Sequence, residues 1–262
     1  CINQRPLVKV GDTVLRDVER IEKAYTSTLD NHGVEHFHER ATVTGPNSVK
    51  LASGREVTAK YILVAVGAWP FMPDIEGVEH CITSNEVFHL EKFPKRVVIQ
   101  GAGYIAMEFA GIFNALGAQV TVVNRSDVIL RSYDETLRDR LLQITMARGI
   151  EYKFNCPLRN VEKQEDGSLL AYPGDKDPVA ADVVLIATGR VPKTEGLGLE
   201  HAGIELGEGG EIPVDEYSRT SCESIFAVGD VTDRVQLAAV AIHEAMCLIE
   251  TLYKNNPTMP EH

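Results

Sequence analysis

The chain has 262 residues, of which 44% are hydrophobic, and its formal net charge is −12 at pH 7. This length and composition suffice to bury a core and to build one large or two ordinary domains. The acidic balance argues against a nucleic-acid partner, because phosphate binding needs a basic surface. The longest apolar runs, such as residues 61–67, are too short to cross a bilayer, so we expect a soluble, cytoplasmic protein without a membrane partner.

Five cysteines are spread along the chain without any C-x-x-C or other close pairing. They stand at positions 1, 81, 156, 222 and 247. This spacing favours free or buried thiols in a reducing compartment over a zinc site or a local redox dithiol. His36 and His38 would share one face of a strand, but no carboxylate or cysteine is placed to complete a metal shell, so we predict no metal site.

The first quarter of the chain combines one helix with a small sheet. Apolar residues recur every three or four positions between Val14 and Leu29 and then meet Gly33, a pattern typical of an amphipathic helix that ends at a glycine. Short alternating runs over residues 34–66, broken by turn compositions, predict an antiparallel meander. The apolar run 61–67 predicts a buried strand that leads into a domain boundary within residues 68–84.

Strands and helices alternate from Lys95 onward. We expect strands at 96–100, 119–124 and 150–155, helices at 105–116 and 134–148, a hairpin at 161–172 and another buried strand at 183–189. This order predicts an α/β fold, namely a Rossmann-like doubly wound domain with a parallel sheet plus a β-meander. A second boundary is expected near Pro192, followed by a strand at 224–228 and an apolar helix at 237–253.

A glycine-rich motif lies directly between the first strand and the first helix of this domain. Gly101, Gly103 and Ala106 form the pattern G-x-G-x-x-A. Gly101 permits the tight turn, Gly103 lets backbone N–H groups approach a pyrophosphate, and Ala106 lets helix and strand pack closely. The phosphates would lie at the positive N-terminus of the helix, so the motif predicts dinucleotide binding.

The end of the second strand indicates which nicotinamide cofactor is bound. An NAD site carries an acid there for the ribose 2′-hydroxyl, whereas an NADP site has arginine for the 2′-phosphate. Here Asn124 is followed by Arg125, and Arg131 comes six residues later. Two guanidiniums suit a phosphate dianion, so we predict NADPH. The alternative is that both are solvated surface arginines.

Four motifs in one order resemble the pyridine nucleotide-disulfide oxidoreductases. They cover residues 101–108, Arg125 with 130–134, 187–192 and 225–230. Within this family the chain is most like the glutathione reductases. The resemblance implies an NADPH-binding domain at 76–192, inserted between a partial FAD-type domain at 1–75 and its returning part at 193–262.

The resemblance also assigns binding roles to individual residues. Tyr104 would cover the nicotinamide pocket, and Asp230 would hydrogen-bond the ribityl chain of FAD. The NADPH site would be lined by Ala102, Ile105, Glu108 and Gly189, together with the two glycines of the motif and the two arginines. Leu237 and Ala238 begin a helix whose N-terminus would face the flavin, where its dipole stabilises negative charge.

The implied activity is that of an NADPH- and FAD-dependent reductase of glutathione disulfide, working through a cysteine pair and homodimeric in full-length relatives. Cys1 has no partner at C-x-x-x-x-C spacing, and neither an N-terminal FAD fingerprint nor the family's C-terminal His-Pro…Glu pair is found. Because the chain opens at Cys1 instead of a methionine, we interpret it as an internal fragment. We therefore expect no catalytic residue in this chain and no disulfide reduction by it alone.

Two further departures concern the flavin, and two alternatives stay open. Ala238–Ala239 stand where the family usually has Thr-Pro, and Ala65–Val66–Gly67 replace its usual Ala-Thr-Gly. One alternative is a non-catalytic NADPH-binding module. The other is a relative that reduces another small disulfide, or another member of the family such as a lipoamide dehydrogenase or a mercuric reductase. Arg125 and Arg131 argue against the NAD-linked lipoamide dehydrogenases.

Overall fold

The computed structural model describes residues 8–261, which form two compact units. Within the described chain, unit 1 comprises residues 8–34 and 70–189, and unit 2 comprises residues 35–69 and 190–261. The chain therefore passes from one unit to the other three times, after residues 34, 69 and 189. Short paired strands, β5 (Ala68–Pro70) and β13 (Arg190–Pro192), lie at the second and third of these passages. No helix within the described part is long and apolar enough to span a membrane.

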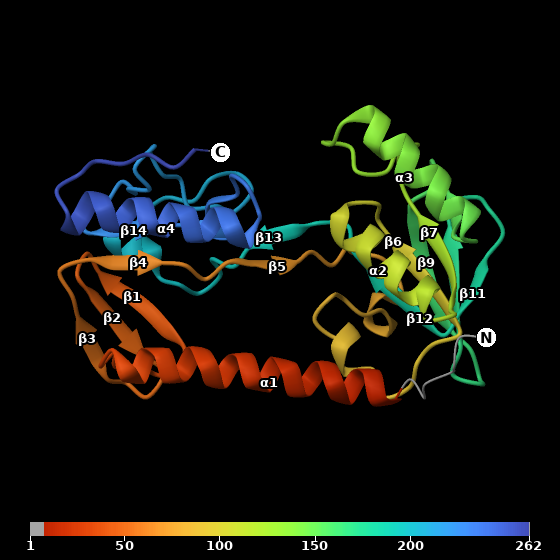
Figure 1. Cartoon of the computed structure of the whole chain (residues 1–262), viewed down its shortest axis with the longest axis horizontal. Coiled ribbons are helices and arrows are strands. Elements are labelled where there is room, and N and C mark those ends of the chain that lie inside the picture. Colours follow the sequence, from red (N-terminus) through yellow and green to blue (C-terminus); the bar gives the residue numbers. More distant parts are fainter. Residues whose placement is uncertain (1–7, 262) are drawn as a thin grey trace. The chain divides into compact units, whose positions relative to one another are not determined.

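A four-stranded parallel sheet forms the centre of unit 1, as the alternating pattern predicts (Figure 1). Its order is β12 (Val183–Ile186), β6 (Arg96–Gln100), β7 (Gln119–Val123), β8 (Glu151–Lys153). Helix α2 (Tyr104–Ala115) connects β6 to β7, and α3 (Glu135–Ala147) connects β7 to β8. The chain runs outward from β6 in one direction and later returns to its other side with β12. This reversal is the switch point at which doubly wound sheets bind ligands, beyond the carboxyl ends of the strands.

Both faces of this sheet are covered, which explains why its strands are apolar throughout. On one face, Val97, Ile99 and Val122 pack against α2 and α3 in a core that includes Phe113. On the other face, side chains such as Val98 pack against an antiparallel meander. The meander consists of β9 (Leu158–Lys163), β10 (Leu169–Pro173) and β11 (Val179–Ala181). The predicted hairpin is thus correct, and β11 adds a third strand to it.

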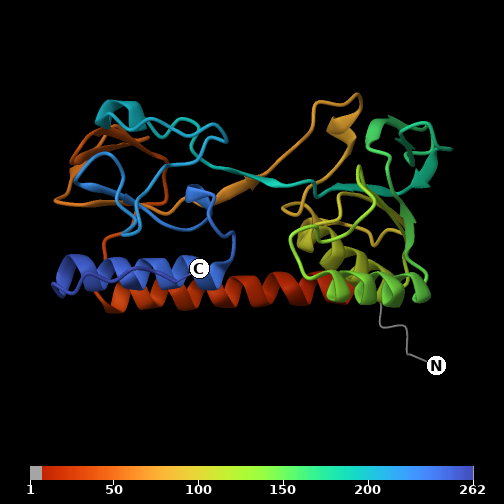
Figure 2. The same cartoon turned by 90° about the horizontal axis from the view of Figure 1, so that it is seen from above.

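The N-terminal helix belongs to unit 1. Figure 2 shows α1 (Val8–Asn31) as one uninterrupted helix, and Gly33 follows it with a positive φ of 66°. Helix α1 contacts the short 3-10 helix η2 (Val87–His89), and another 3-10 helix, η1 (Val78–His80), precedes η2. Helix α1 is thus grouped with residues 70–189, and the expectation that residues 1–75 belong to one FAD-type domain stays a prediction.

Unit 2 contains two small sheets and the C-terminal helix. The predicted meander is present as β1 (Ala41–Gly45), β2 (Ser48–Leu51) and β3 (Glu56–Thr58), paired antiparallel. Strands β4 (Ile62–Val64) and β14 (Ile225–Ala227) pair in parallel, and two 3-10 helices, η3 (Leu199–Ala202) and η4 (Gly229–Thr232), flank β14 in sequence. Helix α4 (Ala238–Tyr253) packs on the face of β14 that carries Phe226, through Leu248. Ile225 points into the other core of the unit.

An ion pair holds the amino ends of β6 and β12 together. Asp182 accepts hydrogen bonds from the backbone N–H groups of Lys95 and Arg96 at 2.9 and 3.0 Å. Its other oxygen accepts from Nη2 and Nε of Arg96 at 2.6 and 3.1 Å. Partial burial raises the pKa of Asp182, but the hydrogen bonds from Arg96 and Lys95 outweigh it, so the pKa lies below its ordinary value of 3.8. The folded state therefore favours the ionised carboxylate.

We expect Asp182→Asn to lower the free energy of unfolding by about 1 kcal/mol at pH 7, a modest value because both side chains are partly exposed to water. The pKa of Asp182 is lowered on folding, so its contribution is present above pH 3.8 and is lost as the pH falls through the folded-state pKa. Urea unfolding of both proteins between pH 3 and 7 checks this. A difference in the free energy of unfolding between the two proteins that grows at acid pH would contradict this prediction.

Candidate functional site

The glycine turn between β6 and α2 joins the carboxyl ends of three strands. Gly101 has a φ of +114°, which side chains rarely adopt, and its N–H donates to the carbonyl of Val123 at the end of β7 at 2.9 Å. A Cβ at this position would lie 2.2 Å from the carbonyl oxygen of Ala187, just beyond β12. Only glycine therefore permits this close approach of β6, β7 and β12.

Gly103 stands at the N-terminus of α2 and faces open space. It is the N-cap residue, with φ −76° and ψ −178°, and no side chain caps the helix. A Cβ there would meet no atom within 4 Å. The first N–H groups of a helix have no partner within it, and the helix dipole makes this end positive. The helix therefore begins with an uncapped end that is suited to an anion. Ala106, the third small residue of the motif, is completely buried against the core.

The other residues expected to line the site lie along the same edge of unit 1. Ala102 is buried, Tyr104 and Ile105 are half-buried in the first turn of α2, and Glu108 is exposed one turn later. Gly189, with a φ of +153°, follows β12. Because β6 and β12 are parallel neighbours, their carboxyl ends bring these residues to one side of the sheet.

The two arginines lie on the loop that follows β7. Both Arg125 and Arg131 are exposed, and within the described residues neither guanidinium has a hydrogen-bond or salt-bridge partner. The loop is tied to the glycine turn, because the N–H of Leu130 donates to the carbonyl of Ala102 at 2.8 Å. Leu130 is itself buried and has a positive φ of 47°. The loop that carries these two arginines is thus bonded to the glycine turn that precedes α2.

The predicted residues of unit 2 follow β14. The carboxylate of Asp230 lies 3.6 Å from Nη2 of Arg190, which also donates to the carbonyl of Ala68 at 2.7 Å. Leu237 is the N-cap residue of α4 without a side-chain hydrogen bond, and Ala238 is the first residue of the helix. Both are exposed, and leucine offers no side-chain acceptor to the first N–H groups of the helix.

Several polar contacts around these sites escaped the sequence analysis. Glu244 of α4 is 1% exposed, accepts from the N–H of Gly229 at 2.6 Å and pairs with Arg234 at 2.9 Å. Asn124, at the end of β7, is also buried, and its side chain bonds the following loop. The signal for Asn124 was an uncharged polar residue where an acid is usual, but sequence alone gave no direction for its side chain.

The described cysteines form no disulfide. Burial, followed by the nearby charge of Glu79, raises the pKa of Cys81 to about 12, so this thiol is protonated at neutral pH and is a poor nucleophile. Cys1, which has no partner at C-x-x-x-x-C spacing, lies outside the described residues. Among residues 8–261, no three His, Cys, Asp or Glu side chains are grouped to hold a metal ion.

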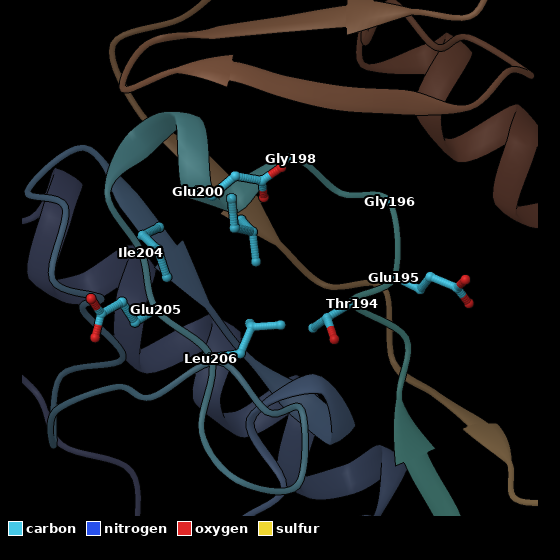
Figure 3. A pocket seen from close by; sticks show the side chains of 9 residues that line it. Thr194, Glu195, Gly196, Gly198, Glu200, Ile204, Glu205 and Leu206 are labelled. Atoms are coloured by element: carbon cyan, nitrogen blue, oxygen red, sulfur yellow. The ribbon is translucent and has the colours of Figure 1, made fainter.

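A separate cavity of about 440 Å³ lies in unit 2, around the loop that contains η3 (Figure 3). The side chains of Ile204 and Leu206 face into it, whereas Glu195 and Glu205 turn outward. Thr194, which donates a hydrogen bond to the carbonyl of Gly210, forms part of the wall. None of the residues predicted to bind a cofactor lines this cavity.

Residues 3–245 match the family model for pyridine nucleotide-disulphide oxidoreductases. The chain belongs to this family. A glutathione reductase from Burkholderia cepacia is 43% identical over 246 residues, which cover 94% of this chain and 54% of the relative. A trypanothione reductase from Leishmania donovani is 44% identical over 275 residues, which cover 100% of this chain and 55% of the relative. The chain therefore spans about half the length of these relatives.

A solved structure supports the same fold. The Cu(II) complex of an HOCl-induced flavoprotein disulfide reductase from Escherichia coli superimposes with a TM-score of 0.91 at 24% sequence identity. The alignment covers 98% of this chain and 59% of that one. At this identity the likeness establishes the Rossmann-type α/β fold, which agrees with the fold class expected from the alternation of strands and helices.

The two glycines of the turn provide a matched pair of variants. We expect Gly101→Ala to lower the free energy of unfolding by about 3 kcal/mol, because the new methyl group meets a backbone carbonyl at a positive φ. Gly103→Ala should change stability by less than about 1 kcal/mol, since its methyl group points into open space.

Gly103→Ala, which should change stability little, should instead change the affinity for a dinucleotide. Gly103→Ala places a methyl group where a pyrophosphate would approach the helix, so it should weaken NADP⁺ binding by about tenfold or more. Thermal denaturation and calorimetric titration of both variants check the two effects. Unaltered NADP⁺ affinity in Gly103→Ala would remove Gly103 from the site.

Proposed function

We propose that unit 1 binds NADPH at the carboxyl edge of its parallel sheet. The observation that carries this proposal is the pair of unpaired arginines, Arg125 and Arg131, on a loop bonded to the glycine turn. No acid stands at the end of β7, where an NAD site would hold the ribose 2′-hydroxyl. A 2′-phosphate would supply the anion that both guanidiniums lack.

The residues present suit the rest of the dinucleotide. The backbone of Gly101 and Gly103 and the uncapped end of α2 would hold the pyrophosphate, because N–H groups point there and no Cβ intervenes. Tyr104 and Ile105, in the first turn of α2, and Gly189, after β12, would border the nicotinamide. When bound, NADPH supplies a hydride. Our proposal gives this chain the tasks of binding and orienting the cofactor.

We further propose that unit 2 belongs to an FAD-type domain. Asp230 is held by Arg190 at the end of β14, where a carboxylate can accept from a ribityl hydroxyl. The uncapped N-terminus of α4, at Leu237 and Ala238, would face the flavin and stabilise negative charge on it. The whole protein would then be an NADPH-dependent flavoprotein disulfide reductase, with electrons passing through FAD to a small disulfide.

Glutathione disulfide is the substrate we propose for the whole protein, by its similarity to glutathione reductases. The similarity to a trypanothione reductase, at 44% identity, supports a related small disulfide as the second candidate. The 262 residues contain no C-x-x-x-x-C pair, and disulfide exchange requires a thiolate. We therefore expect no disulfide reduction by this chain alone, with its own role limited to cofactor binding.

The double substitution Arg125→Ala with Arg131→Ala tests the proposed cofactor. Removing both guanidiniums should weaken NADPH binding by about a hundredfold, since two charge-assisted contacts to the phosphate are lost, while NADH binding changes little. Fluorescence titration with each nucleotide measures this. Arg148→Ala, another exposed arginine of unit 1, serves as the control. An equal loss for both nucleotides would contradict the 2′-phosphate assignment.

A visible absorption spectrum separates a flavoprotein piece from a simple NADPH-binding module. If the residues of unit 2 suffice to retain FAD, the purified chain shows a flavin band, and anaerobic NADPH bleaches it. A colourless protein that takes up no added FAD but binds NADPH would contradict the FAD proposal. It would favour the non-catalytic NADPH-binding module instead.

A further inference from the structure

The side chain of Asn124 turns into the loop that follows β7. Asn124 is 8% exposed at the end of β7. Its backbone is fixed on both sides, because its N–H donates to the carbonyl of Lys153 at 2.9 Å and its carbonyl accepts from the N–H of Cys156 at 3.0 Å. In an NAD site the residue at this position extends toward the ribose. Here the amide lies inside the loop that follows.

The amide of Asn124 bonds three oxygen atoms of that loop. Its Nδ2 donates to the carbonyl of Val128 at 2.9 Å, to the hydroxyl of Ser126 at 3.0 Å and to the carbonyl of Ser126 at 3.3 Å. The same Ser126 carbonyl also accepts from the N–H of Asn155 at 3.3 Å. Two of these partners are carbonyl oxygens, which can only accept, so this position requires a donor that the aspartate of an NAD site lacks.

Two separate sets of hydrogen bonds hold the loop backbone next to the two arginines. Arg125 lies between Asn124 and Ser126, which are bonded to each other. Arg131 follows Leu130, which is buried, has a positive φ and donates to the carbonyl of Ala102. The carbonyl of Arg131 also accepts from Arg138 of α3 at 3.4 Å. Both exposed guanidiniums are thus carried on a backbone that is held before any ligand arrives.

We propose that Asn124 is a positioning residue for NADP specificity, which acts through the loop and does not touch the cofactor. The hydrogen bonds of its amide hold residues 125–128 against the end of β7. In this conformation Arg125, together with Arg131, would contact the 2′-phosphate. An ordered loop binds a phosphate more tightly than a mobile one, because less conformational entropy is lost on binding. This inference rests on the proposed NADPH function and adds a specificity determinant to it.

The test compares NADP⁺ with NAD⁺, which differ only in the 2′-phosphate, by calorimetric titration of the 262-residue chain. Asn124→Ala should weaken NADP⁺ binding by about tenfold, the equivalent of one net hydrogen bond, and leave NAD⁺ binding within about twofold. Asn124→Asp should weaken NADP⁺ binding further, because its carboxylate keeps the shape of the amide but repels the loop oxygens and the phosphate.

Thr121→Ala is the matched control for a general loss of stability. Thr121 lies on β7, three residues before Asn124, and is also 8% exposed, but its side chain makes no hydrogen bond to the loop or to any other described residue. It should lower the melting temperature without changing the ratio of NADP⁺ to NAD⁺ affinity. An Asn124→Ala variant with the same ratio as the wild type overturns the positioning role.

The ratio of NADP⁺ to NAD⁺ affinity in the wild-type chain separates failure of the proposed 2′-phosphate site from failure of the Asn124 role. Wild-type protein that binds NADP⁺ no better than NAD⁺ overturns the proposed 2′-phosphate site, and with it the role of Asn124. Wild-type protein that prefers NADP⁺, together with an unchanged ratio in Asn124→Ala, overturns only the positioning role. A preference for NADP⁺ that falls in both Asn124 variants and persists in Thr121→Ala supports it.

Discussion

The close approach of β6 to β12 beyond their carboxyl ends is the constraint on which the candidate site depends. Gly101 lies so near the carbonyl of Ala187 that no side chain fits between them. The N–H of Gly101 also bonds Val123, so the ends of three parallel strands meet at one residue. The loops that leave these strands carry Gly103, Arg125 and Gly189, and they are therefore brought to the same edge of the sheet.

Much of this fold could be predicted because chain order and side-chain periodicity determine it locally. The strand 96–100 matches β6 residue for residue, since a continuous apolar run meets a glycine that must turn. Helix α4 was found within one residue of its start for the same kind of reason. Strand β11 was missed because Val179–Ala181 is too short to show a period and depends on pairing with β10. The grouping of α1 depends on tertiary packing, which no local pattern reveals.

Some features of the candidate site could likewise be predicted from the sequence, and others could not. The glycine turn and the arginine loop could be placed from sequence, because each follows a strand of the same parallel sheet. The direction of the Asn124 side chain could not, since it depends on where the carbonyls of Ser126 and Val128 fall after the loop has folded. The pairing of Arg190 with Asp230 likewise joins residues 40 positions apart. Such contacts form only when the unit has folded, so the spacing of residues along the sequence does not reveal them.

The ion pair of Arg96 and Asp182 has a consequence for how the sheet can change over evolution. It holds the amino ends of β6 and β12, whereas the glycine turn and the arginine loop occupy the carboxyl ends. The contacts that join the two strands and the proposed nucleotide site are thus at opposite ends of the same pair of strands. Loops at the carboxyl end can exchange one ligand preference for another while the anchor at the amino end keeps the strands in register.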